Sequence, residues 1–203
     1  MDVLVLLDAV AGATVLAGAT VVVAADRRVG LGSFLAQYVG VAALLYAAGF
    51  PAAALTRLGV AASAAAILWL TLVRIGWGPR PTQETPLPAG RWFRLSAALL
   101  VAVGAWGLSE SIAAVFPGLT IAHARVGAML FGFGLLHLGL TEDPIRWIFA
   151  LVTCLLGFEI VYAVLEPSLA VQSILASVHL GILVVGADIA VRREAAGEAP
   201  PNP

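Results

Sequence analysis

The sequence predicts an all-α integral membrane protein with seven transmembrane helices, an external N-terminus and a cytoplasmic C-terminus. Of its 203 residues, 61% are hydrophobic and only 11% are charged, whereas soluble domains have about 45 to 50% apolar and about 25% charged residues. The apolar residues form runs of about 20, which is long enough to cross a hydrocarbon core of about 30 Å as helices. Composition and run length together exclude a soluble domain.

Seven apolar segments give the predicted spans in chain order: residues 3–24, 31–50, 53–73, 95–116, 119–140, 145–165 and 168–191. The first segment carries Asp2 and Asp8 instead of the basic start of a signal peptide, so it is kept as a span. Residues 1–75 therefore hold three helices and residues 95–193 hold four. Residues 76–94 contain many prolines and glycines and form one extended cytoplasmic loop. Residues 194–203 lack apolar periodicity and form a disordered tail.

The arginines predict the orientation, because basic residues beside short loops stay cytoplasmic. Nine of the eleven flank one set of helix ends: Arg27, Arg28, Arg74, Arg80, Arg91, Arg94, Arg146, Arg192 and Arg193. On the other side only Arg57 lies in a loop, and Arg125 lies inside the start of the fifth helix. The pattern predicts a multi-pass protein of the cell inner (cytoplasmic) membrane.

Several function classes are excluded by residues that the sequence lacks. It contains no lysine, so it cannot form the retinal Schiff base of a microbial rhodopsin. A net charge of -1 without a basic stretch argues against nucleic acid as a partner. Phosphate-binding glycine loops, zinc-protease motifs and nucleophile elbows are absent, and the single Cys154 cannot ligate an iron–sulfur cluster. We therefore expect no catalytic residues, no cofactor and no metal.

Ionisable residues inside the predicted spans are candidates for proton transfer, because they are costly in hydrocarbon. Glu159 is the strongest candidate, since it lies deep in the sixth helix. His179 lies at a matching depth if the sixth and seventh helices form an antiparallel hairpin. His137 in the fifth helix and Glu110 in the fourth complete the set. Each has a packing role as the alternative, such as a protonated, hydrogen-bonded carboxyl for Glu159 or a neutral histidine bonded to a helix carbonyl for His179.

The last two helices carry motifs in a recognisable order. An arginine precedes a long apolar helix containing Gly157-Phe158-Glu159, and Glu166-Pro167 leads into a last helix that ends in Arg192-Arg193. This order resembles the small NuoK-type subunit of respiratory complex I and its relatives in cation/proton antiporter complexes, which have a glycine, an apolar residue and a buried glutamate in the same helix. The NuoK-like part covers residues 119–193.

The first half extends the resemblance. Ala25-Asp26-Arg27-Arg28, followed by Phe34-Leu35-Ala36-Gln37 at the start of the second helix, is similar to the hydrogenase-4 component E family. Members of that family add four helices ahead of the NuoK-like part. The length, the seven spans and the orientation agree over nearly the whole chain.

The resemblance implies a non-catalytic integral membrane subunit of a complex I-like or group 4 hydrogenase-like proton-translocating assembly. Such a subunit anchors antiporter-like subunits within the lipid bilayer and lines or borders a proton path. Redox chemistry then belongs to peripheral subunits, so the chain is expected to be part of an oxidoreductase or ion-translocating complex without a catalytic centre of its own. Two alternatives stay open, namely a small stand-alone transporter or permease, and an accessory subunit of another respiratory or photosynthetic complex.

Overall fold

The structure is a computed structural model that describes residues 3–77, 90–166 and 168–197. Within these ranges the chain is all-helical, without strands, and its helices are α1 (Val3–Val23), α2 (Arg27–Ala47), α3 (Pro51–Ile75), α4 (Arg91–Val115), α5 (Ile121–Gly139), α6 (Pro144–Leu165) and α7 (Leu169–Gly197). All seven are long and apolar enough to cross a membrane. The prediction of a multi-pass helical membrane protein with seven spans is confirmed at this level.

The helix bounds agree with the predicted spans to within a few residues, apart from extensions at the arginine-bearing ends. α2 and α4 each begin four residues early, at Arg27 and Arg91, and α7 continues to Gly197. Residues 91–94 of the expected loop and residues 194–197 of the expected tail are therefore helical. Arginine is a good helix former, so these helices continue beyond the apolar core. The remaining loop residues 78–89 and tail residues 198–203 lie outside the described part of the chain.

Capping aspartates and prolines determine where three of the helices begin. The side chain of Asp26 accepts a hydrogen bond from the backbone N–H of Arg28 at the start of α2. Asp143 caps α6 in the same way, and Pro144 occupies the first helical position after it. Pro51 likewise opens α3. Proline fits the first turn because its missing N–H would have no partner there.

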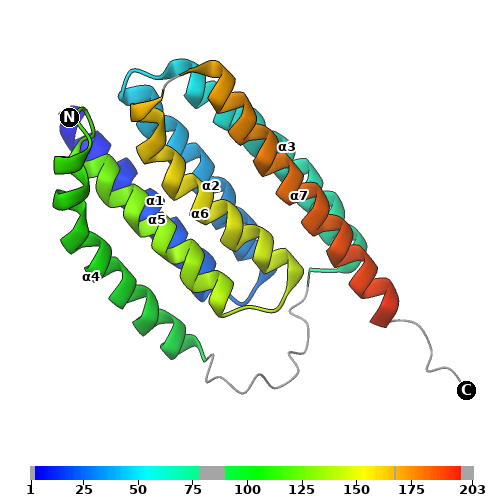
Figure 1. The fold of residues 1–203 in the computed structure, drawn as a ribbon. Helices are drawn as coiled ribbons and strands as arrows, with labels where there is room; N and C mark the ends of the chain where they lie inside the picture. The colour runs from blue at the N-terminus through cyan, green and yellow to red at the C-terminus, as the bar shows by residue number, and fades with distance from the viewer. Residues whose placement is uncertain (1–2, 78–89, 167, 198–203) are drawn as a thin grey trace, which may run out of the picture.

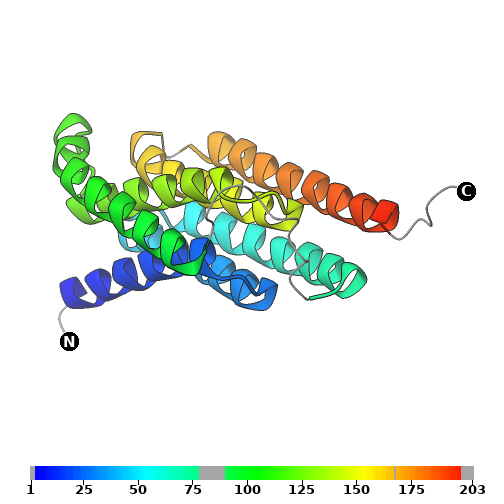
Figure 2. The same ribbon diagram turned by 90° about the horizontal axis from the view of Figure 1, so that it is seen from below.

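The helices form two layers that lie against each other (Figures 1 and 2). α1, α2 and α3 pack side by side in one layer, and α5, α6 and α7 pack side by side in the other. α4 lies at the edge, against α5 and α1. Across the layers α3 packs on α7, α1 on α5 and α2 on α6. α2 and α6 therefore each lie in the middle of a layer, and polar residues on their inner faces are held inside the bundle.

Glycines allow α5 and α6 to approach closely. A Cβ atom on Gly157 would collide with the backbone of Phe131 and of Gly127 on α5. Small residues at a contact let two membrane helices pack backbone to backbone. This contact fixes the position of α6 and thereby of Glu159, two residues beyond Gly157.

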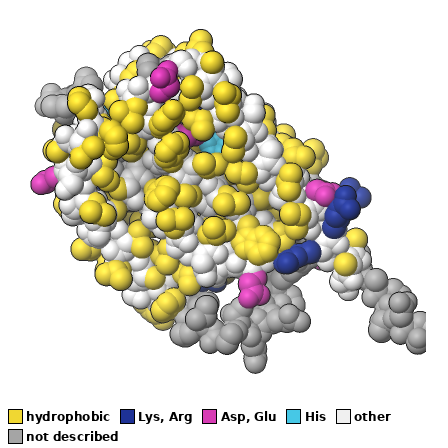
Figure 3. Space-filling model, viewed as in Figure 1, with side chains coloured by type: hydrophobic (Ala, Val, Ile, Leu, Met, Phe, Trp, Pro, Cys, Tyr) yellow, Lys and Arg dark blue, Asp and Glu magenta, His cyan; other side chains and the backbone are white. Residues whose placement is uncertain are grey.

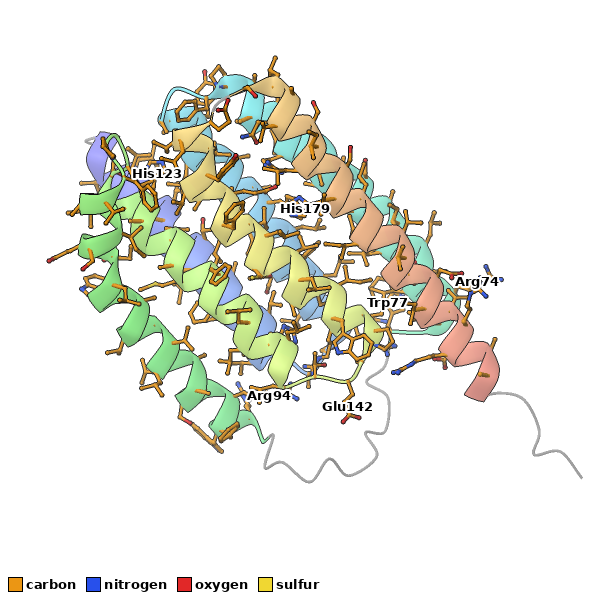
Figure 4. All side chains as sticks on the ribbon, in the orientation of Figure 1. Arg74, Trp77, Arg94, His123, Glu142 and His179 are labelled. Carbon is orange, nitrogen blue, oxygen red and sulfur yellow. The ribbon has the colours of Figure 1, made fainter. Side chains whose placement is uncertain are left out.

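One end of the bundle, called here the arginine end, holds all but two of the described arginines. Arg27 forms an ion pair with Asp143 at 2.9 Å and donates to the Gly76 carbonyl at 3.1 Å. Arg146 donates to the carbonyl of Ala24. Arg94 and Glu142, labelled in Figure 4, lie at this end, and Figure 3 shows basic side chains at the lower right of a largely hydrophobic face. The bundle thus has one arginine-rich end, and its assignment to the cytoplasm stays a prediction.

Candidate functional site

A charged pair lies inside the bundle between α3 and α6. Nη1 of Arg57 is 2.9 Å from Oε2 of Glu159, and their side chains are 0% and 1% exposed. Arg57 is about 9 Å along α3 from Pro51, and Glu159 is about 9 Å along α6 from Leu165, at about 1.5 Å per residue. Pro51 and Leu165 both belong to the end opposite the arginine end (Figure 1). The two helices therefore bring the charges together at one depth.

The placement of Arg57 corrects the prediction from sequence. We expected Arg57 in a loop, whereas the structure places it in the second turn of α3, fully buried. The charge of Arg57 favoured a loop assignment although the predicted span of residues 53–73 included this position, and Pro51 starts the helix before it. Once inside the helix, the guanidinium is stabilised by an opposite charge on a neighbouring span.

Two side chains of α7 complete the environment of Arg57. Nη2 of Arg57 donates to Oε1 of Gln172 at 2.7 Å, and Nη1 lies 3.4 Å from Nδ1 of His179. His179 Nδ1 is also 3.7 Å from Oε1 of Glu159. Because an arginine only donates hydrogen bonds, its contact requires an unprotonated Nδ1, which places the proton of a neutral ring on Nε2. Figure 4 shows His179 between α7 and the neighbouring helices.

α2 contributes Tyr38, and we include its buried chain neighbour Gln37 in a set of six buried polar side chains, which we call the buried polar cluster: Gln37, Tyr38, Arg57, Glu159, Gln172 and His179. The ring of Tyr38 meets the ring of His179 edge-on at 5.8 Å. All six side chains are at most 1% exposed. Several of their polar atoms have no hydrogen-bond partner among the described residues, including both amide atoms of Gln37, the Tyr38 hydroxyl and Nε2 of His179. Buried polar atoms of this kind typically bind ordered water.

Aromatic residues separate the buried polar cluster from the arginine end. Phe34, one turn before Tyr38 on α2, contacts the Tyr38 ring at 5.3 Å and the Phe149 ring at 5.1 Å. Both phenylalanines are at most 1% exposed. Phe149 lies about 15 Å along α6 from Glu159 on the side of the arginine end. The cluster is consequently nearer to water at the opposite end.

Of the four proton-transfer candidates, the structure brings only Glu159 and His179 together. His137 is buried in the last turn of α5, within electrostatic reach of Arg94 and Arg146. Its depth differs from that of Glu159 by about 19 Å. Glu110 lies on the exposed face of α4. His137 and Glu110 therefore lie outside the buried polar cluster.

Four members of the cluster were not among the proton-transfer candidates predicted from the sequence. Arg57, Gln172, Gln37 and Tyr38 are polar residues within otherwise apolar helices, and that was the signal available for all four. The proline start of α3 additionally places Arg57 and Glu159 at equal distance from the same end. A comparison of depths from the two helix ends would have paired these charges.

Among the described residues, no group of three or more His, Cys, Asp or Glu side chains is close enough to hold a metal ion. No protein-family profile, characterised protein or solved structure matches the chain.

Proposed function

We propose that the protein is an integral subunit of a multisubunit proton-translocating membrane assembly of the complex I-like or group 4 hydrogenase-like kind, with Glu159 as a proton-exchanging group. It lies in the cell inner membrane with its arginine end in the cytoplasm. In this proposal the redox centres belong to other subunits, and the antiporter-like subunits that the chain anchors carry out the rest of the translocation.

The buried pair of Arg57 and Glu159 is the single observation that carries this proposal. Removing two charges from water costs several kcal/mol per ion, and their attraction offsets this cost only with good geometry. In other proteins, replacing a buried ion pair with well-packed apolar side chains of similar volume is often neutral or stabilising, so stability alone does not explain such a pair. Ionisable groups inside membrane spans accordingly mark ion or proton pathways as a default hypothesis.

The surroundings of Glu159 suit proton exchange. Arg57 stabilises the carboxylate at 2.9 Å, and Gln172 holds the guanidinium in place at 2.7 Å. His179, at 3.7 Å, offers a second group that can bind or release a proton. Polar atoms of Gln37 and Tyr38 that have no partner among the described residues can bind water and extend the path.

The outer surface supports a role within a larger assembly. α4 and α7 have few buried residues within this chain and expose large apolar side chains such as Leu99, Leu100, Val184 and Val185. Exposed apolar surface in a membrane contacts lipid or the helices of other subunits. The resemblance of residues 119–193 to NuoK-type subunits favours other subunits as the neighbours of part of this surface.

The proposal is tested with Glu159→Gln and Glu159→Ala in the native membrane. Gln keeps the shape and most of the hydrogen bonding but removes proton exchange, whereas Ala also opens a cavity. We expect Glu159→Gln to leave assembly with the larger subunits intact and to reduce proton movement coupled to electron transfer. Glu110→Gln is the matched control, because that carboxyl lies outside the cluster, and it should change neither property.

Two results would overturn the proposal. The first is a Glu159→Gln variant that translocates protons as the unmodified protein does while only Glu159→Ala disturbs assembly, which makes Glu159 a packing residue. The second is purification of the chain alone from mild detergent, followed by solute transport in reconstituted vesicles, which would identify a stand-alone permease.

A further inference from the structure

A narrow groove runs along the outer surface between α6 and α7. Its volume is about 300 Å³. Its walls are apolar and include Trp147, Leu151, Gly181, Ile182 and Val185. The groove reaches Pro144, the first residue of α6, so its lower mouth opens at the arginine end.

Basic side chains stand at this mouth. Arg193 follows Ile189, a residue of the groove wall, by one helical turn on α7. Its guanidinium lies 5.2 Å from the centre of the Trp147 ring, and Nη1 donates to the Glu142 carbonyl at 3.1 Å. The neighbouring Arg192 is exposed and pairs through Nε with Asp188 at 2.7 Å.

We propose that the groove binds one acyl chain of a membrane phospholipid and that Arg193 binds the headgroup phosphate at its mouth. A guanidinium carries five N–H donors in a planar fork that matches phosphate, and the bond to Glu142 uses one of them. Basic sites between transmembrane helices on the cytoplasmic side bind lipid headgroups in this way. The inference does not depend on the proposed proton path.

The mouth of the groove recognises a phosphate group through hydrogen bonds more than through net positive charge. Asp188 partly offsets Arg192, and Glu142, whose backbone carbonyl accepts from Arg193, is an exposed acidic residue. Local charge therefore gives little long-range attraction, and recognition rests on the directed donors of Arg193.

The dimensions of the groove favour a lipid chain over a partner helix. An α-helix with its side chains is about 10 to 12 Å across and would occupy several times 300 Å³ over the length of the groove. A hydrocarbon chain is much thinner than a helix, and Gly181 and Leu151 both line the groove that it would occupy.

The test uses the purified full-length chain in detergent and native mass spectrometry. Phosphatidylglycerol is titrated, and diacylglycerol with the same acyl chains serves as the probe without a phosphate. Arg193→Gln removes the phosphate donors. Gly181→Leu places a branched side chain in the groove wall, and its Cβ meets nothing within 4 Å.

Two control variants match these changes. Arg74→Gln removes another exposed arginine of the same end, which Figure 4 labels. Gly59→Leu adds the same side chain at another exposed helical glycine with open space around it. If Gly181→Leu does not fold, Val185→Phe replaces it, since Val185 is a half-exposed residue of the same groove.

We expect Arg193→Gln to weaken phosphatidylglycerol binding about fivefold, the equivalent of about 1 kcal/mol per basic residue, and to leave diacylglycerol binding unchanged. Gly181→Leu should weaken binding of both lipids, and the control variants should weaken neither. An equal effect of Arg74→Gln and Arg193→Gln would overturn the proposal in favour of diffuse surface charge. Unchanged binding in Gly181→Leu would overturn it as well, because the groove would then not hold the lipid.

Discussion

Removing both members of the pair formed by Arg57 and Glu159 should destabilise the bundle far less than the sum of the two single removals. Arg57→Met replaces the guanidinium with an unbranched apolar side chain and leaves the carboxylate of Glu159 buried without its partner. Glu159→Gln leaves the guanidinium buried without a counter-charge, beside the neutral side chains of Gln172 and His179. The double variant has no buried charge at either position.

The distances give the expected size of the effect. At 2.9 Å and an effective dielectric constant of about 20, the attraction is about 6 kcal/mol, and much of it offsets desolvation. Breaking a buried pair from one side costs about 3 to 5 kcal/mol. Arg57→Met also loses the charged hydrogen bond to Gln172, worth about 1.5 to 3 kcal/mol. We expect about 5 kcal/mol for Arg57→Met, about 3 for Glu159→Gln and about 5 for the double variant.

The two single costs sum to about 8 kcal/mol, whereas the double variant is expected to cost about 5 kcal/mol. The coupling free energy of this double-mutant cycle is therefore about 3 kcal/mol. The free energy of unfolding is measured by titrating the detergent-solubilised protein with a denaturing detergent and recording helical circular dichroism. Arg125→Gln is the control. That arginine also lies in a spanning helix, but it stacks 3.5 Å from the centre of the Trp106 ring, and its loss should cost about 1 kcal/mol.

If the double variant loses about 8 kcal/mol of unfolding free energy, the two single costs are additive, and the geometry of the buried pair is refuted. A cost for Arg57→Met no larger than that for Arg125→Gln would equally refute it, since it would place Arg57 in water as the sequence analysis expected.

Two further predictions concern packing and orientation. Gly157→Ala should destabilise the bundle by about 1 to 3 kcal/mol, because the added Cβ collides with the backbone of α5; Gly104→Ala, where nothing lies within 4 Å, should be neutral or stabilising in the same unfolding assay. Membrane-impermeant thiol reagents applied to the outside of intact cells should label Glu166→Cys and not Glu142→Cys, and labelling of both from one side would contradict the seven-span topology.

The sequence predicted the helices well because their determinants are local. Apolar runs of membrane-spanning length do not depend on distant contacts, and prolines and capping residues at the helix starts refine their bounds. Glu159 could be singled out for the same reason, since its depth follows from its position within one helix. The matching depth of His179 also followed from the short connection between α6 and α7.

The pairing of charges could not be obtained as easily, because it depends on which helices are neighbours. α3 and α6 are far apart in the chain, and only the packing of the two layers brings Arg57 to Glu159. Glu110 and His137 were candidates on depth and residue type alone. In the folded bundle, Glu110 is exposed on α4 and His137 lies near the arginine end. Tertiary packing therefore separates both residues from the cluster.

The position of the cluster bears on whether this chain could conduct protons alone. On the side of the opposite end, Gln172 lies about 5 Å from the start of α7, so polar groups approach the water boundary there. On the side of the arginine end, Phe34 and Phe149 are followed by further apolar core residues such as Leu31 and Ile145. A proton that reaches Glu159 from one side therefore meets an apolar layer in this chain, and a second polar route must come from elsewhere. A neighbouring subunit that supplies this route is what the proposed assembly requires, whereas a stand-alone carrier would have to open the aromatic layer on every cycle.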